Sequence, residues 1–366
     1  MTLCCLLLFF LYLFVIFRLY GGFLKVKTFE ITNRYPDTKF TIIVPFRNEA
    51  ENLPSLLESL SKLHYPVDLF EVILVDDGSE EQWSVVSDQY SVRIITNNRV
   101  SNSPKKDAIL TALNIATNDW IVTTDADCVV NADWLLCFDN FIRQNDAEMI
   151  AGAVAYSGNK SFLHAFQQLD VASLQAATIG SFGLGNAFMC NGANFAYTKS
   201  LFEKLDGFAG NTDFAGGDDV FLLQEAVRHF PEKVLYIKAA NAIVQTKPEN
   251  SWQDLFFQRV RWASKASGYR SWFGKFLGLI IFSTNLVWLL LVAYCFLDAA
   301  HGRLLTVFTT LKFAADYFLI AAANKFLGQK TRWFLPACFV YPFFSTAVVL
   351  YSLFGKFEWK GRTFKK

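Results

Sequence analysis

The stretch that decides the fold is Trp120-Ile-Val-Thr-Thr-Asp125-Ala-Asp127. Its apolar and β-branched start predicts a strand, and the two carboxylates follow where this strand gives way to a loop. Alternate side chains of a strand project to the same face, so Asp125 and Asp127 can converge on one cation while Ala126 turns away. Ligands of open α/β sheets bind at such carboxyl ends. Hard divalent ions take oxygen ligands and keep positions free for substrate phosphates, so we expect Mg²⁺ or Mn²⁺ to be held here against a diphosphate.

An isolated Asp-x-Asp also fits a solvated turn with a helix cap, so the surrounding pattern has to decide. From residue 39 to 250 short apolar runs alternate with amphipathic ones. The expected strands cover residues 40–44 (ending at Pro45), 71–75, 92–96 and 120–124, and the expected helices cover 51–63 and a segment beginning at Ser103-Pro104. Strands alternating with helices predict an α/β fold with a mostly parallel sheet covered on both faces. No Gly-x-Gly-x-x-Gly follows the first strand, which argues against a dinucleotide-binding fold.

Acidic residues recur at the ends of these strands. Asp76 and Asp77 follow one strand, and Asp125 and Asp127 follow another. The carboxyl ends of parallel strands lie at one edge of a sheet, so we expect a shared site there. Further along, Gly216-Gly217-Asp218-Asp219 is a glycine turn that leads into a helix. Asp218 can be an ordinary helix cap, or this turn can deliver a carboxylate to the site as a general base.

Both ends of the chain are apolar. Residues 3–17 form an uncharged run that is followed by Arg18, Lys25 and Lys27. A signal peptide carries its positive charge before the apolar run, so this order is the reverse. It is typical of a retained membrane anchor with a cytoplasmic domain after it. Residues 276–297, 304–323 and 334–354 are apolar again and long enough to predict membrane insertion. Three full crossings would place the basic tail outside, against the positive-inside tendency. Either one segment is re-entrant, with 304–323 the main candidate because it carries Lys312 and Asp316, or the tendency fails here.

This gives an expected organisation for a multi-pass protein of the cell (inner) membrane. The expected parts are an anchor at 1–20, a catalytic domain at 39–250, an amphipathic interface helix at 251–270, a membrane region of two to three spans at 275–355 and a basic tail at 356–366. The net charge of +1, with 18% charged residues, gives no reason to expect nucleic-acid binding. Seven scattered cysteines form no disulfide framework, which fits a reducing compartment.

Six short motifs occur in order. They are Val44-Pro-Phe-Arg-Asn-Glu49, Val75-Asp-Asp-Gly-Ser79, Pro104-Lys-Lys-Asp-Ala108, Asp125-Ala-Asp127, Gly217-Asp-Asp219 and Gln258-x-x-Arg-Trp262. Together they resemble the membrane-bound branch of the family 2 glycosyltransferases, over roughly residues 41–262. The resemblance implies an A-type nucleotide-sugar-binding fold with membrane helices at both ends. Each motif alone is weak, but the ordered set is specific.

The resemblance also implies roles for individual residues. Asp77 would read the nucleotide, with Pro45, Arg47 and Glu49 beside it, and Lys105 would lie near the diphosphate. Asp125 and Asp127 resemble the pair that holds metal and diphosphate, with both as metal ligands. Asp219 takes the place of the catalytic base, and Asp218 stands where the family usually has Glu. Gln258, Arg261 and Trp262 resemble the motif that clamps the diphosphate and the acceptor end.

The implied reaction is the inverting, metal-dependent transfer of a sugar from a nucleoside diphosphate sugar, expected to be a UDP-hexose, to a hydroxyl of a membrane lipid. The few membrane segments make the chain most similar to ceramide-glucosyltransferase-like enzymes. A processive polysaccharide synthase of the cellulose, chitin or hyaluronan type shares the Gln-x-x-Arg-Trp motif but needs a channel for the growing chain. A membrane assembly subunit with a degenerate domain is the non-catalytic alternative. A glycoside hydrolase would need two carboxylates that bracket the bond.

Overall fold

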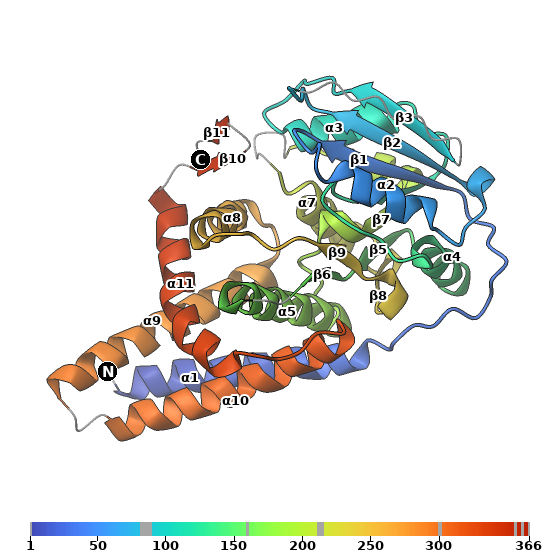
Figure 1. Cartoon of the computed structure of the whole chain (residues 1–366). Helices are drawn as coiled ribbons and strands as arrows, with labels where there is room; N and C mark the ends of the chain where they lie inside the picture. The colour runs from blue at the N-terminus through green and yellow to red at the C-terminus, as the bar shows by residue number, and fades with distance from the viewer. Residues whose placement is uncertain are drawn as a thin grey trace. The chain divides into compact units, whose positions relative to one another are not determined.

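The computed structural model describes residues 2–80, 90–158, 161–210, 216–298, 302–354, 357–359 and 362–364. The chain forms two compact units. The sheet unit consists of Val26–Ser157 and Ala187–Lys247, and the helical unit consists of Met1–Lys25, Gly158–Asn186 and Pro248–Lys366. Figure 1 labels the elements of both units. The sheet unit is therefore assembled from two separate stretches of sequence.

The sheet unit contains a seven-stranded sheet with the order β3-β2-β1-β4-β7-β5-β8. Its strands are β1 (Phe40–Phe46), β2 (Phe70–Asp76), β3 (Ser91–Thr96), β4 (Trp120–Thr123), β5 (Met149–Gly152), β7 (Phe195–Thr198) and β8 (Val234–Ile237). Strands β3, β2, β1 and β4 are mutually parallel, and β5 is parallel to β8. Strand β7 runs antiparallel to both β4 and β5. The expected α/β fold with a mostly parallel sheet is confirmed, with β7 as the antiparallel member.

A smaller parallel pair joins β6 (Val154–Tyr156) to β9 (Val244–Thr246). The helices of the sheet unit are α2 (Leu53–Ser61), α3 (Pro104–Leu113), α4 (Trp134–Gln144), α6 (Lys199–Lys204) and α7 (Asp218–His229). Short 3-10 helices cover η1 (Val67–Leu69), η2 (Gly192–Asn194), η3 (Pro231–Lys233) and η4 (Ala240–Ala242). The helix expected over 51–63 is shorter at both ends than the pattern suggested, and the helix after Ser103 begins at Pro104 as expected, since proline is favoured in the first turn.

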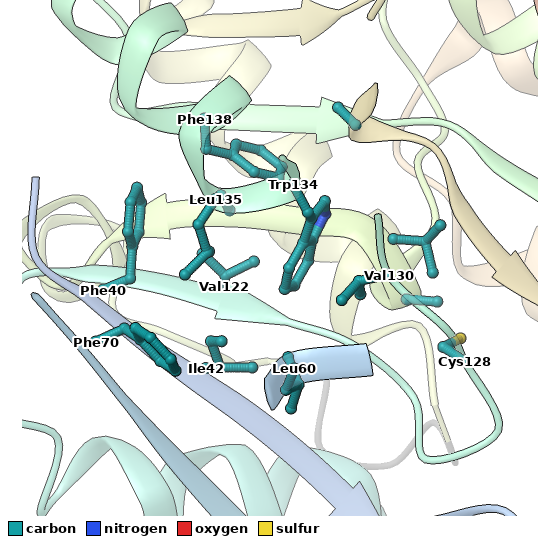
Figure 2. Packing of buried hydrophobic residues seen from close by; sticks show 14 of the residues in the cluster. Phe40, Ile42, Leu60, Phe70, Val122, Cys128, Val130, Trp134, Leu135 and Phe138 are labelled. Atoms are coloured by element: carbon teal, nitrogen blue, oxygen red, sulfur yellow. The ribbon is translucent and has the colours of Figure 1, made fainter. Parts of the chain in front are cut away.

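One face of the sheet is covered by a large apolar core. The residues at alternate positions of β1, β2 and β4 point to this face and meet side chains from α2 and α4. Figure 2 shows Trp134, Leu135 and Phe138 in one cluster with Phe40 and Val122. Trp134, Leu135 and Phe138 are completely buried. Burying a large apolar side chain contributes roughly 1.5–3 kcal/mol, so this cluster holds the strand ends at fixed positions.

Strand β1 does not stop at Pro45, as the sequence suggested, but continues to Phe46. Its pairing with β4 covers Phe40 to Ile43 only, whereas its pairing with β2 continues to the Phe46–Asp76 pair. Beyond Ile43 the strand is therefore an edge on one side. Proline, which lacks an N–H donor, is tolerated at such an edge.

The helical unit contains α1 (Thr2–Lys25), α5 (Phe162–Gly183), α8 (Trp252–Ser264), α9 (Trp272–Leu297), α10 (Gly302–Phe326) and α11 (Phe334–Phe354), with η5 (Lys265–Gly268) and the hairpin strands β10 (Phe357–Trp359) and β11 (Arg362–Phe364). Four segments in the described part of the chain are long and apolar enough to cross a membrane: Cys5–Lys25, Trp272–Leu297, Gly302–Phe326 and Phe334–Phe354. The suspected re-entrant segment belongs to α10, which is a continuous helix of 25 residues.

The charged residues of α10 are paired inside the helical unit. Lys312 Nζ lies 2.8 Å from Asp316 Oδ2, one helical turn away, and Tyr12 of α1 donates a hydrogen bond to the same carboxylate. The Lys312 side chain is only 3% exposed. Partnering of this kind lowers the cost of placing charged groups in an apolar helix, so Lys312 and Asp316 do not by themselves argue against a span.

Helices α1 and α5 pack with their backbones in close contact. A Cβ atom added to Gly22 of α1 would lie 2.1 Å from the carbonyl oxygen of Gly180 of α5. A Cβ atom added to Gly183 would lie 1.9 Å from the carbonyl oxygen of Gly22. No side chain larger than hydrogen fits at these positions without moving the helices apart. Small residues permit this close approach, which is a common means of packing helices in membranes.

Candidate active site

The carboxyl edge of the parallel strands brings together the acidic residues singled out in the sequence. Lys105, in the first turn of α3, lies between two of them: its Nζ is 2.7 Å from Asp125 Oδ1 and 3.6 Å from Asp218 Oδ2. Asp125 follows β4, and Asp218 is the first residue of α7. The fold therefore places one ammonium group against carboxylates from two distant segments.

The surroundings of Lys105 keep it charged. Burial alone lowers the pKa of this amine, but the neighbouring carboxylates of Asp125, Asp218 and Asp219 more than offset burial and raise the pKa well above its usual value. An ammonium group that stays protonated can balance the carboxylates around it and can also contact an anionic ligand. A compact cation at this position is suited to a diphosphate.

Asp219, in the first turn of α7, has a fixed orientation. Its Oδ2 accepts a 2.7 Å hydrogen bond from the backbone N–H of Gly192, and its Oδ1 accepts a 2.7 Å hydrogen bond from the N–H of Val220. Gly192 is held in turn by Thr123 of β4, whose hydroxyl donates to the Gly192 carbonyl at 2.7 Å. The position of Asp219 is thus tied to the central sheet.

Gly192 was missed by sequence reasoning. A Cβ atom at this position would lie 3.2 Å from Asp218 Oδ2 and 3.3 Å from Lys105 Nζ. The chain passes so close to the charged groups that a side chain would press against them. A lone glycine outside a recognisable turn motif gives no sequence signal for such an approach.

Asp218 does not cap α7, which corrects one of the two interpretations of this residue. Gly217 is the N-cap, with φ of 73° in the left-handed region, and it offers no side chain. Asp218 is the first helical residue and is 5% exposed. Two carboxylates in the first turn interact favourably with the helix dipole, and the charges of both raise the pKa of Lys105.

Asp127 occupies a more enclosed position than Asp125. Its Oδ2 accepts a 3.1 Å hydrogen bond from the hydroxyl of Thr246, at the end of β9. Burial raises the pKa of Asp127, and the charges of Asp125 and Glu49 add to the rise, whereas the hydrogen bond from Thr246 opposes it. Accumulated negative charge of this kind is relieved when a cation binds.

The donor set of this pair fits a hard divalent ion, because it consists of carboxylate oxygens with no imidazole. Among the described residues no group of three or more His, Cys, Asp or Glu side chains is arranged to hold a metal. Asp125 and Asp127 would therefore need further oxygen ligands from water or from a diphosphate. Mg²⁺ in particular is commonly bound by one or two carboxylates together with substrate phosphates.

Asp77 is enclosed by groups that sequence reasoning did not single out. Asn97 Nδ2 donates to Asp77 Oδ1 at 2.7 Å, and Arg99 Nε donates to the same oxygen at 2.5 Å. Arg47 contacts the Asp77 carbonyl at 3.5 Å. Asp77 is 6% exposed. Asn97 and Arg99 follow β3, so their contact with Asp77 depends on β2 and β3 being neighbours, which only the fold establishes.

The remaining predicted site residues are placed as follows. Pro45 lies in β1, and Glu49 follows it and accepts a 2.6 Å hydrogen bond from Asn52 at its Oε2. Gln258, Arg261 and Trp262 lie on α8 in the helical unit, where Gln258 Nε2 donates to Glu249 Oε1 at 2.6 Å.

Comparison with known proteins places these features in context. Residues 41–206 match the model of glycosyl transferase family 2. The chain is 24% identical over 272 residues to the probable glycosyltransferase YdaM of Bacillus subtilis, covering 69% of this chain and 62% of that protein. It is 34% identical over 110 residues to the undecaprenyl-phosphate 4-deoxy-4-formamido-L-arabinose transferase of Proteus mirabilis, covering 28% of this chain and 31% of that protein. The chain thus matches less than two thirds of the length of either relative.

Among solved structures, the chain is similar to mannosyltransferase PcManGT from Pyrobaculum calidifontis, determined in complex with GDP-Man and Mn²⁺. The TM-score is 0.53, the sequence identity is 16%, and the alignment covers 96% of both chains. At this level of identity the similarity establishes the fold.

Proposed function

We propose that this chain, which carries a glycosyltransferase family 2 domain over residues 41–206, transfers a sugar from a nucleoside diphosphate sugar to a hydroxyl of a membrane lipid, with inversion at the anomeric carbon. The observation that carries the proposal is the position of Lys105 between Asp125 and Asp218 at the carboxyl edge of the sheet, with Asp219 alongside. This arrangement would supply a cation, a carboxylate pair for a metal and a carboxylate base to the proposed reaction.

Donor binding is assigned to the strand-end residues. Asp77, together with Pro45 in β1 and with Arg47 and Glu49 just after β1, would contact the nucleotide, and Lys105 would contact the diphosphate. Asp125 and Asp127 would hold Mg²⁺ or Mn²⁺, which supplies charge stabilisation to the diphosphate when bound. Gln258, Arg261 and Trp262 are assigned to the diphosphate and acceptor end on the strength of their motif.

Asp219 is proposed as the base. It would take the proton of the acceptor hydroxyl as that oxygen bonds to the anomeric carbon and the bond to the diphosphate breaks. The nucleoside diphosphate leaves with both electrons of that bond, and Lys105 and Arg261 would offset its charge. A single direct displacement inverts the anomeric configuration. The backbone donors of Gly192 and Val220 support this role because they hold the carboxylate in one orientation.

Two observations support a lipid acceptor. In the part of the chain that the structure describes, four helices are long and apolar enough to cross a membrane, and one of the relatives acts on undecaprenyl phosphate, according to its name. A lipid phosphate is already ionised and needs no base, whereas a lipid hydroxyl does. A hydroxyl acceptor would therefore use the proposed base, Asp219. Within the family we place this chain with the ceramide-glucosyltransferase-like enzymes that transfer a single sugar.

The test is a transfer assay with the full chain in detergent or nanodiscs, using labelled UDP-hexoses and GDP-mannose with a host lipid extract. We expect a labelled lipid carrying one sugar. A ladder of long products would favour a processive synthase instead. No transfer with any donor, together with no binding of UDP or GDP, would favour the non-catalytic assembly subunit.

We further propose that the sheet unit faces the cytoplasm, where nucleotide sugars are found. Native Cys128 and Cys137 are unsuitable as reporters because both are buried. Glu58 on α2 has an exposed side chain, so Glu58→Cys offers an accessible thiol. Labelling of this cysteine in intact cells by a membrane-impermeant reagent would contradict the orientation, whereas labelling only after lysis is expected.

A further inference from the structure

Arg259 of α8 carries a buried positive charge. It is one residue after Gln258, and its side chain is 7% exposed. A guanidinium group stays protonated in proteins, so its burial is costly unless it is paired and hydrogen-bonded. The partner is Asp170 of α5, which is also 7% exposed, and the Arg259 Nε to Asp170 Oδ2 distance is 2.5 Å. Sequence reasoning singled out neither residue.

The same guanidinium group contacts two side chains of the Gln-x-x-Arg-Trp motif. Arg259 donates a hydrogen bond from Nη1 to the Gln258 side-chain oxygen. Its central carbon lies 4.1 Å from the centre of the Trp262 ring. A planar guanidinium group can form hydrogen bonds in its plane and stack through its face at once, which an ammonium group cannot do. Arg259 therefore sets the orientation of both Gln258 and Trp262.

A second chain of hydrogen bonds connects α5 with the side-chain nitrogen of Gln258, whereas Arg259 contacts its side-chain oxygen. Gln167, three residues before Asp170 and on the same face of α5, exchanges two hydrogen bonds with the backbone of Glu249: its Nε2 donates to the carbonyl at 2.9 Å, and its Oε1 accepts from the N–H at 2.8 Å. Glu249 Oε1 then accepts a 2.6 Å hydrogen bond from Gln258 Nε2. The Gln258 amide is thus held at both its nitrogen and its oxygen.

We propose that Asp170 and Arg259 are positioning residues, which hold Gln258 and Trp262 in the orientation that sugar transfer requires. The catalytic consequence rests on the proposed function, whereas the geometric part does not. The alternative is that the Asp170–Arg259 pair only stabilises the packing of α5 against α8. The two accounts predict different kcat values for a variant that keeps the positive charge and the ion pair with Asp170 but lacks the planar guanidinium group.

Arg259→Lys makes this change in the full chain. We expect kcat to fall about tenfold or more, because small misplacements of binding groups are costly to rate. The midpoint of thermal unfolding should stay close to the wild-type value, because an ion pair with Asp170 can still form. Arg93→Lys is the matched control, since Arg93 also pairs with a buried carboxylate, that of Glu71 in β2, and contacts no proposed site residue. Equal kcat in Arg259→Lys and wild type would overturn the proposal.

A spectroscopic measurement decides the geometric part without any activity. Loss of the guanidinium stack should change the fluorescence of Trp262, so the emission of Arg259→Lys should differ from wild type. This difference should vanish when both are compared in a Trp262→Phe background. A difference that persists there would overturn the proposed link. A wild-type protein that shows no transfer would refute the proposed function but leave this result standing.

Asp170→Asn provides a second variant, which should lower kcat by itself and would overturn the proposal if its kcat equalled that of wild type. It keeps the shape of the side chain and removes its charge. If Asp170 acts through Arg259, the effects of Asp170→Asn and Arg259→Lys on kcat should be strongly less than additive in the double variant. Additive effects would show that the two residues act independently and would overturn the proposal.

Discussion

The backbone N–H of Gly192 donates a 2.7 Å hydrogen bond to the Asp219 carboxylate. These residues come from different parts of the sheet unit: Gly192 begins η2, just before β7, and Asp219 lies in the first turn of α7. The bond joins the proposed base to the loop that Thr123 fastens to the central sheet. A base fixed in this way needs little reorganisation when the acceptor arrives.

Asp219→Asn should keep donor binding but lose transfer. It removes the proton acceptor while preserving shape, and general-base catalysis contributes roughly 10²–10⁴-fold to rate. Asp218→Asn is the control variant and should lower transfer less, because Asp218 lies 3.6 Å from Lys105 and is not the proposed base. The measurement is single-turnover transfer together with binding of the nucleoside diphosphate. Near-normal turnover of Asp219→Asn would disprove the base assignment, and it would favour an acceptor that is already ionised.

Asp127→Asn should weaken Mn²⁺ binding and lower transfer by about 10²-fold or more, since one charged ligand of a diphosphate-bound cation is lost. The fold should be unchanged, because the asparagine oxygen can still accept the hydrogen bond from Thr246. Chelation of the wild-type protein should abolish transfer. The checks are Mn²⁺ titration by electron paramagnetic resonance and activity in excess chelator. Full activity under chelation would refute the metal site.

Gly22→Ala should destabilise the contact between α1 and α5, whereas Gly21→Ala should be neutral. A Cβ atom at Gly22 would lie 2.1 Å from the Gly180 oxygen, and one at Gly21 meets nothing within 4 Å. Forcing atoms into a packed contact costs about 1–3 kcal/mol. The adjacent glycines have the same helix propensity, so the difference between the two variants isolates packing. Thermal unfolding in one detergent is the measurement, and equal midpoints would contradict the close contact.

Glu71→Gln should destabilise the sheet unit in a pH-dependent way. Burial alone raises the pKa of Glu71, but hydrogen bonds from Thr117 and Thr41, together with the charge of Arg93, more than offset it, so the net pKa is lowered. Hydrogen bonds to a charged group contribute about 1.5–3 kcal/mol.

The direction of the pH dependence follows from the lowered pKa of Glu71. A carboxyl with a lowered folded pKa contributes stability above its unfolded pKa, about 4.3 for Glu, and loses it as the pH falls through the folded value. The difference in free energy of unfolding between wild type and Glu71→Gln should therefore be present at neutral pH and shrink in acid. Glu51→Gln, at an exposed position, is the control and should change little. A difference that does not depend on pH would contradict the charged network.

Much of the fold follows from local patterns in the sequence. Short apolar, β-branched runs predicted the strands that end in Asp76 and before Asp125, because strands of a parallel sheet are buried on both faces and read as continuous apolar segments. Long apolar runs predicted the helices that are able to cross a membrane, since the length of such a run matches a bilayer. These signals are local, so a single sequence suffices to reveal them. The sharing of one edge by Asp77 and Asp125 also followed, because parallel strands end together.

Other features were decided by tertiary structure alone. Asn97 reaches Asp77 only because β3 lies beside β2, and Gly192 reaches Asp219 only because β7 inserts antiparallel to β4. The pairing of Asp170 with Arg259 is of the same kind.

The sequence by itself determined which residue types stand at the strand ends and where apolar helices occur, because backbone geometry imposes these on neighbouring residues. The tertiary structure decided which distant groups meet. A contact such as that of Gly22 with Gly180 leaves no local pattern, because its energy depends on the packing of two helices and not on the residues beside it in the chain.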